Sequence, residues 1–331
     1  MKKKIIISFI ILLLAVVAFG MLIAFQNNSF QDGVRFSDDT TQHQACYPIN
    51  GGMIMVTPDV RMFFDSTSPV STINGRDIAK LEASGVKIDS VSTIFVGLNP
   101  DRKLTVARQI YIVALPAPYF DVDPTRSRCT AFFPEYDSCG SIENVKFIRD
   151  DSRLSRLGMD FIERFAVEYS WAKSMIILLD SVPDEFQKFA DMHREFSPID
   201  VVFSPGPQYF LDLEVDGRRN DFFIDTTLPR ITINVPEDDG VKDAGGVPDP
   251  YRFRGRYVNA VREPDQLVLI GARAKYQDIH RSSAVNKGER YFCNPLNMVV
   301  NDVVLDFPSG NLLIRRGSRI GHNPGFGLPS E

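Results

Sequence analysis

The chain is short of the residues that bind metals and cross-link small secreted domains: its 331 residues include 4 Cys, 4 His and 1 Trp. It also lacks an excess of basic charge, because 37 Lys and Arg stand against 42 Asp and Glu. Neutralising phosphates requires a basic face, so the composition argues against nucleic acid as a partner. With 44% apolar and 24% charged residues the chain is globular in composition, and its length is typical of two domains.

Signatures of metal-dependent and serine hydrolases are missing as well. The four histidines have no metal-ligand spacing with one another or with the cysteines, and neither a His-Glu-x-x-His motif nor a nucleophile elbow occurs. We therefore predict no metal and no cofactor.

The N-terminus contains one long hydrophobic run. Ile5 to Phe25 is uncharged and as a helix would reach roughly 31 Å, which is enough to span a bilayer. Because Lys2, Lys3 and Lys4 precede it, the positive-inside rule predicts a single-pass anchor with a cytoplasmic N-terminus and an extracytoplasmic remainder. A cleaved signal peptide is the alternative, since Ala18-Phe19-Gly20 offers small residues to a signal peptidase.

In an exported chain, the four cysteines suggest up to two disulfides. Of the three possible pairings we favour Cys129 with Cys139, because they flank a short loop that contains Pro134. That choice leaves Cys46 and Cys293 to join the two ends of the folded part. A zinc site is the competing use of these cysteines, and the absence of ligand spacing argues against it.

The pattern along the chain predicts two strand-rich halves. Short β-branched and aromatic runs, broken by Gly, Pro and Asn, follow a polar segment after the leader. Helical spacing of apolar residues predicts a helix across 184–196, between the halves. The predicted organisation is an anchor (1–26), a stalk (27–45), an N-terminal lobe (46–182), a connector (183–204), a C-terminal lobe (205–316) and a tail (317–331).

Two segments of the sequence are copies of one another. Residues 62–74 (MFFDSTSPVSTIN) align without a gap to residues 222–234 (FFIDTTLPRITIN), at a fixed offset of 160. Both contain Asp-x-Thr-x-Pro-x-x-Thr-Ile-Asn, which unrelated strand segments rarely share. We infer that the two halves are copies of one structural unit.

The repeated motif suggests a chemistry. If the copies pack about a pseudo-twofold axis, Asp65 and Asp225 meet there, and two carboxylates about 3 Å apart share one proton. One carboxylate can then take a proton from water while the other protonates the carbonyl oxygen of an amide. The hydroxyls of Ser66 and Thr226 would hold the two loops together across the axis.

These motifs resemble those of the aspartic peptidases, both the two-lobed pepsin type and the single-lobed retropepsins. Phe63-Phe-Asp-Ser-Thr and Phe223-Ile-Asp-Thr-Thr are similar to the family's hydrophobic-hydrophobic-Asp-(Thr/Ser)-Gly signature. The segment from Leu157 to Leu178, with Gly158, resembles its hydrophobic-Gly motif, short helix and closing strand. In the second half, residues 299–314 resemble the closing hairpin, and the hydrophobic-Gly element is either Leu269-Ile270-Gly271 or Leu296-Asn297-Met298.

The resemblance implies an all-β, bilobal pepsin-like fold, and the apolar run of the N-terminus adds a transmembrane helix in front of it. It implies an endopeptidase in which Asp65 and Asp225 form the dyad, Ser66 and Thr226 support it, and an extended peptide lies in the cleft as substrate.

Two departures from the family pattern favour other interpretations. Thr67 and Thr227 stand where the family has Gly or Ala, and a β-branched side chain there restricts the backbone and occupies space beside the dyad. Between Gly85 and Gly97 there is Phe95 but no flap tyrosine. The alternatives are a catalytically inactive pseudopeptidase that binds peptides or supports assembly, a β-rich surface adhesin, and aspartates that only stabilise turns.

Overall fold

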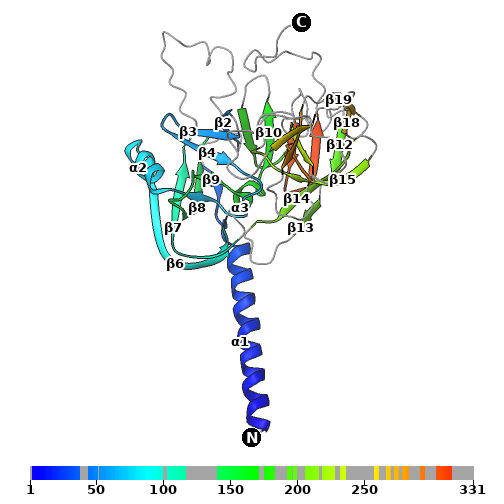
Figure 1. Cartoon of the computed structure of the whole chain (residues 1–331). Helices are drawn as coiled ribbons and strands as arrows, with labels where there is room; N and C mark the ends of the chain where they lie inside the picture. The colour runs from blue at the N-terminus through cyan, green and yellow to red at the C-terminus, as the bar shows by residue number, and fades with distance from the viewer. Residues whose placement is uncertain are drawn as a thin grey trace.

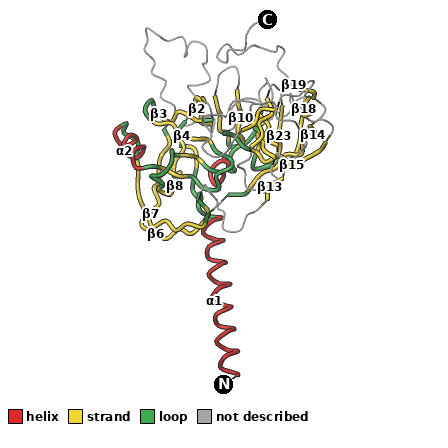
Figure 2. The backbone as a smooth tube through the Cα atoms, in the orientation of Figure 1, coloured by secondary structure: helices red, strands yellow, loops and turns green. Residues whose placement is uncertain are grey.

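The structure, a computed structural model, is an all-β body behind one N-terminal helix, α1 (Lys2–Asn28) (Figures 1 and 2). It describes residues 2–37, 44–50, 52–99, 103–116, 140–170, 175–182, 192–195, 197–199, 206–215, 218–227, 232–235, 257–260, 266–269, 272–275, 278–282, 291–294 and 303–314. Two short helices, α2 (Gly75–Ala83) and α3 (Met159–Ile162), accompany the strands.

The larger of the two described sheets has 14 strands in the order β12-β23-β22-β10-β11-β2-β3-β4-β9-β5-β8-β7-β6, with β1 paired to β8. Strands from the end of the chain therefore lie beside strands from its first half. The strands are β1 (Arg35–Phe36), β2 (Gln44–Asn50), β3 (Met53–Thr57), β4 (Val60–Phe64), β5 (Thr72–Ile73), β6 (Ile88–Leu98), β7 (Leu104–Leu115), β8 (Ile142–Arg149), β9 (Arg156–Leu157), β10 (Ala166–Ser170), β11 (Met175–Leu179), β12 (Met192–Glu195), β22 (Val303–Asp306) and β23 (Asn311–Ile314).

The smaller described sheet has nine strands in the order β17-β20-β16-β21-β15-β14-β18-β19, with β13 paired to β14. The strands are β13 (Ser197–Ile199), β14 (Gln208–Val215), β15 (Arg218–Ile224), β16 (Thr232–Val235), β17 (Tyr257–Ala260), β18 (Gln266–Leu269), β19 (Ala272–Lys275), β20 (Asp278–Ser282) and β21 (Tyr291–Cys293).

The two sheets share one local plan around the repeated segments. β4 pairs in parallel with β9, and β15 pairs in parallel with β21. β5 runs antiparallel to β9 and parallel to β8, just as β16 runs antiparallel to β21 and parallel to β20. The sequence repeat is therefore a structural repeat, and the predicted all-β fold of two related halves behind an N-terminal helix is confirmed.

Alternating burial explains the strands that lead to the site. In β4, Val60, Met62 and Phe64 are buried between more exposed neighbours, as expected for a strand with one face on the core. After β5, Asn74 caps α2: its Oδ1 accepts from the backbone N–H of Asp77 at 2.8 Å.

One expected helix is wrong where the structure describes it. Residues 192–195, at the end of the predicted 184–196 helix, form strand β12, which pairs antiparallel with β23. The hydrogen bonds offered by β23 override the helical spacing of the apolar residues. Residues 183–191 lie outside the described residues.

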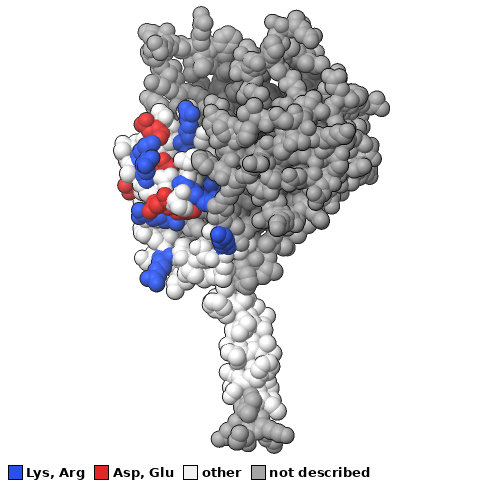
Figure 3. Space-filling view, viewed as in Figure 1, with Lys and Arg blue, Asp and Glu red and all other residues white. Residues whose placement is uncertain are grey.

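Helix α1 is long and apolar enough to cross a membrane. The most apolar 18-residue window of the span Ile6–Asn27 has a mean hydropathy of 3.1, and 6% of that window is buried inside the protein. In Figure 3 the described part of this helix bears no charged side chain. A signal sequence has the same features.

The residues that follow α1 pack on the larger sheet, although their polarity predicts a stalk. Phe30 and Gln31 are buried, and β1 pairs with β8. The Gln31 amide bridges the β8 backbone, donating to the Lys146 carbonyl at 2.8 Å and accepting from the Lys146 N–H at 3.0 Å. This hydrogen-bond pairing allows a polar residue to be buried.

Candidate active site

Each of the two repeated aspartates comes directly after a strand. Asp65 follows β4 and Asp225 follows β15, and each is 4% exposed. The Asp65 backbone N–H donates to the Leu157 carbonyl at 2.9 Å, which continues the β4–β9 pairing up to the aspartate. The parallel strand behind each aspartate fixes the start of its loop.

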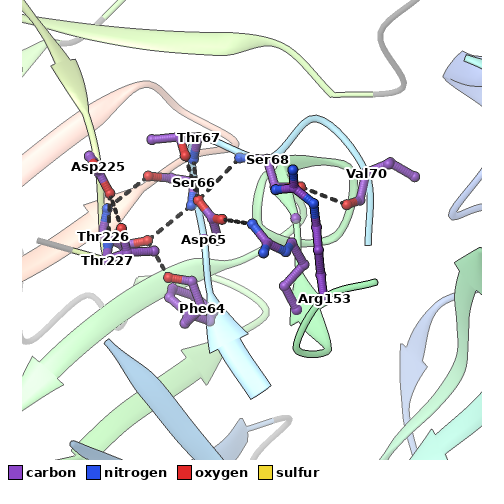
Figure 4. Close-up of polar contacts among 12 residues, drawn as sticks. Phe64, Asp65, Ser66, Thr67, Ser68, Val70, Arg153, Asp225, Thr226 and Thr227 are labelled. Carbon is purple, nitrogen blue, oxygen red and sulfur yellow. Dashed lines mark hydrogen bonds and ion pairs between the residues drawn. The ribbon is translucent and has the colours of Figure 1, made fainter. Parts of the chain in front are cut away.

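Hydrogen bonds join the two aspartate loops (Figure 4). The Ser66 N–H donates to Thr226 Oγ1 and the Thr226 N–H donates to Ser66 Oγ, both at 3.0 Å. Each hydroxyl also donates to a backbone carbonyl of the other half at 2.6 Å. Ser66 Oγ donates to the Ile224 carbonyl, and Thr226 Oγ1 donates to the Phe64 carbonyl. These buried, reciprocal bonds bring the two loops together.

The hydroxyl groups of Thr67 and Thr227 each donate a hydrogen bond to the aspartate two residues earlier in the same loop. Thr67 Oγ1 donates to Asp65 Oδ1 at 2.6 Å and its N–H donates to the same oxygen at 3.0 Å. Thr227 repeats both contacts with Asp225 Oδ1, at 2.6 Å and 2.9 Å. A glycine at either position would supply the N–H but not the hydroxyl.

Sequence reasoning missed a cation at this site. Arg156 of β9 donates from Nη1 to Asp65 Oδ2 at 2.7 Å, and the exposed fractions of the two side chains are 14% and 6%. Its guanidinium also lies over the Phe63 ring, 5.8 Å from the centroid. The signal for this contact is its position two residues before Gly158, because β9 pairs with β4 at Phe63 and so places Arg156 beside the aspartate.

Both oxygens of the Asp65 carboxylate are therefore engaged. Oδ1 accepts from two donors on Thr67 and from the Ser68 N–H at 3.2 Å, and Oδ2 accepts from Arg156. This guanidinium–carboxylate pair is part-buried, and breaking it is costly because the remaining charge loses its partner. By register, Phe292 in β21 takes the strand position that Arg156 has in β9, so the two halves differ here.

The glycine of the first half has an asparagine as its counterpart. A Cβ on Gly158 would stand 2.5 Å from the Val70 carbonyl carbon, so backbone packing requires glycine. In the second half the β15–β21 register places Asn294 at the equivalent position, where it is buried and donates from Nδ2 to the Thr226 carbonyl at 3.1 Å. Neither predicted element, at 269–271 or at 296–298, occupies this position.

Asp160 is another buried carboxylate near the loops. It accepts hydrogen bonds from Gln31 Nε2 and Ser71 Oγ, both at 2.8 Å. Burial raises its pKa to about 6, and these hydrogen bonds oppose that rise. Asp160 thus connects the segment after α1 to the strand that follows the Asp65 loop.

Of the remaining residues that the sequence singled out, Phe95 and Cys46 have described side chains, and Cys129, Cys139 and Cys293 do not. Phe95 is fully buried and packs on Phe30, with ring centroids 4.6 Å apart. Cys46 is buried in β2 and disulfide-bonded. Cys129 and Cys139 lie outside the described residues and Cys293 is described in its backbone only, so the predicted pairings stay predictions. Among the described residues, no group of three His, Cys, Asp or Glu side chains could hold a metal ion.

Comparison with known proteins gives remote likenesses. No family model matches the chain, and no curated protein matches it. Among solved structures, it is similar to conglutin gamma, a basic 7S globulin from lupine seeds (9% identity, 86% of this chain and 94% of that chain covered, TM-score 0.39). It is also similar to basic 7S globulin from soybean (9%, 83% and 96%, 0.44) and to edgp (10%, 85% and 93%, 0.39).

Proposed function

We propose that this chain is a membrane-anchored, extracytoplasmic pseudopeptidase: a pepsin-like fold that keeps its paired aspartates as structure and acts as a peptide-binding or assembly module. The observation that carries the proposal is the Asp65 carboxylate, which accepts from Thr67 and Ser68 on one oxygen and from Arg156 on the other.

The chemistry of the dyad explains why this matters. General acid–base hydrolysis needs a carboxylate oxygen that can accept a proton from water and two carboxyl groups that share one proton. In this site the Arg156 cation occupies the Asp65 oxygen that is not bound by the threonine. A water that binds this oxygen has to compete with the Arg156 guanidinium before Asp65 can act as a base.

An active aspartic endopeptidase is the second candidate. The reciprocal hydrogen bonds between Ser66 and Thr226 favour it, because they hold the two aspartate loops against each other with matched geometry. In that case Asp65 and Asp225 activate water for hydrolysis of an extended peptide, and Arg156 moves away when substrate binds.

Helix α1 supports the membrane-anchored part of this proposal. Its apolar span follows three lysines, and by the positive-inside rule this order of residues supports a cytoplasmic N-terminus with the β-sheets on the other side of the membrane.

A cleavage assay tests the proposal. The full-length protein in micelles is incubated with a diverse peptide library from about pH 3 to 7, the range in which carboxyl dyads share a proton. Asp65→Asn and Asp225→Asn are assayed in parallel. We expect no cleavage that either substitution removes; cleavage by the wild type that both substitutions abolish would establish the endopeptidase instead.

A further inference from the structure

The β6–β7 hairpin has an apolar outer face close to α1. Ile94, Leu104 and Val106 are 67%, 62% and 58% exposed, and these are large hydrophobic side chains. The register pairs Leu98 with Leu104 and Val96 with Val106. Leu98, Leu104, Val96 and Val106 are cross-strand neighbours on one face of the hairpin. Ile94 lies two residues before Val96, in the bulge between Ser92 and Phe95, and its side chain is exposed beside them. We call these five residues the apolar hairpin face.

The inner face of the same hairpin is fixed to the end of α1. Phe95, opposite Ala107, packs on Phe30, and Gln26 donates from its side-chain amide to the Ile94 carbonyl. In Figure 1 the hairpin runs from beside α2 down to the end of α1 that meets the β-body. The apolar hairpin face therefore lies at the level where the apolar span of α1 ends, at Asn27.

Buried contacts, rather than a flexible linker, fix the position of the hairpin relative to the end of α1. Gln31 is 1% exposed and is bonded both to the β8 backbone and to Asp160. The hairpin, the end of α1 and the larger sheet are thus held together by buried contacts within a few residues of the span.

Charge on the hairpin agrees with a lipid surface. Within the described residues 94–99 and 103–108 the charged side chains are Lys103 and Arg108, both exposed, and no acidic residue occurs. Basic residues that flank an exposed apolar strip are typical of elements that lie in the plane of a bilayer interface, where long side chains reach the headgroups.

We propose that the apolar hairpin face lies in the headgroup–acyl boundary of the membrane that α1 spans, making the β6–β7 hairpin a second membrane contact. The inference rests on the anchor of the proposed function and is independent of whether the dyad is active. With two contacts, the β-body has a fixed orientation on the membrane and cannot rotate about α1.

Tryptophan quenching tests this placement, because the native chain has one tryptophan. Full-length Ile94→Trp and Val106→Trp are reconstituted into phosphatidylcholine vesicles with lipids brominated in the upper acyl chain. Leu154→Trp is the matched control, because Leu154 is 56% exposed but lies away from α1. The carbonyl of its neighbour Arg153 accepts a hydrogen bond from Asn74, the cap of α2, and Figure 1 shows α2 far from α1. The wild-type emission supplies the background.

We expect the added emission of Ile94→Trp and Val106→Trp to be quenched about twofold or more above that of Leu154→Trp, since interfacial elements bury roughly 5–10 Å into this boundary. Equal quenching of all three, in protein that resists extraction from the vesicles, overturns the hairpin contact and leaves the anchor standing. Protein that alkaline carbonate extracts from the vesicles overturns both. Unquenched hairpin tryptophans together with a dimer that Leu104→Glu dissociates would assign the face to a second copy of the chain.

Discussion

Single hydroxyl groups connect the two halves at the residue scale. Ser66 Oγ accepts from the Thr226 N–H and donates to the Ile224 carbonyl, so Ser66→Ala leaves a buried donor and a buried acceptor unpaired. We expect this change to lower the free energy of unfolding by about 2–4 kcal/mol, measured by denaturant titration. Thr226→Ser keeps the matching hydroxyl and should cost less than about 1 kcal/mol. A Ser66→Ala protein as stable as Thr226→Ser would contradict the role of these bonds.

Asp160 predicts a pH dependence of stability. Its pKa rises from 3.8 to about 6 on folding, so the folded state binds the proton more tightly than the unfolded state. Stability is therefore highest below the unfolded value and falls as the pH rises from about 4 to about 6, by up to about 3 kcal/mol. Thermal denaturation across this window should have a weaker slope in Asp160→Asn than in the exposed control Asp59→Asn. Identical slopes would mean that Asp160 ionises as freely as in the unfolded chain.

At the scale of elements, the chain just after β9 packs so closely against the segment that follows Asp65 that it requires glycine at Gly158. A Cβ there would lie 2.5 Å from the Val70 carbonyl carbon and 2.9 Å from the Ser68 carbonyl oxygen, both backbone atoms. We expect Gly158→Ala to lower the melting temperature strongly, with a loss of about 3 kcal/mol or more. In the control Gly75→Ala the nearest atom, at 2.8 Å, is the end of the exposed Arg149 side chain, which can move. If both variants melt together, the close packing at Gly158 is not what the structure depicts.

The repeat explains how much of these elements could be predicted. Two ungapped copies of one motif predict two equivalent aspartate loops and the hydroxyls between them, because the signal is local and occurs twice. Arg156 could not be predicted in the same way, since its contact with Asp65 depends on a parallel pairing between strands far apart in sequence. Asn294 was missed because no glycine marks its position.

Part of the predicted stalk packs on the larger sheet for a related reason. Gln31 is polar, and polarity alone indicates a solvated segment, but its amide finds backbone partners on β8 and a carboxylate on Asp160. Hydrogen-bonding partners of this kind become visible only when the sheet is assembled.

At the scale of the whole molecule, the anchor predicts a topology. Protease added to intact cells should remove the β-body and leave a short membrane fragment that contains α1, because the proposed topology puts the body outside the cytoplasm. A cytoplasmic marker protein that stays intact is the control. A freely soluble protein whose N-terminus begins near Met21 would mean that the leader is a cleaved signal peptide.

The central claim for the whole molecule is that its paired aspartates form a closed site. Pepstatin places a hydroxyl between the carboxylates of an open dyad, so its binding to the full-length protein, measured by calorimetry, tests the claim most directly. The triple variant Thr67→Gly, Thr227→Gly and Arg156→Met, which removes the three added donors, is the matched comparison. We expect no saturable binding to the wild type below about 100 μM, and tighter binding to the triple variant. Micromolar binding to the wild type that Asp65→Asn abolishes would contradict the account.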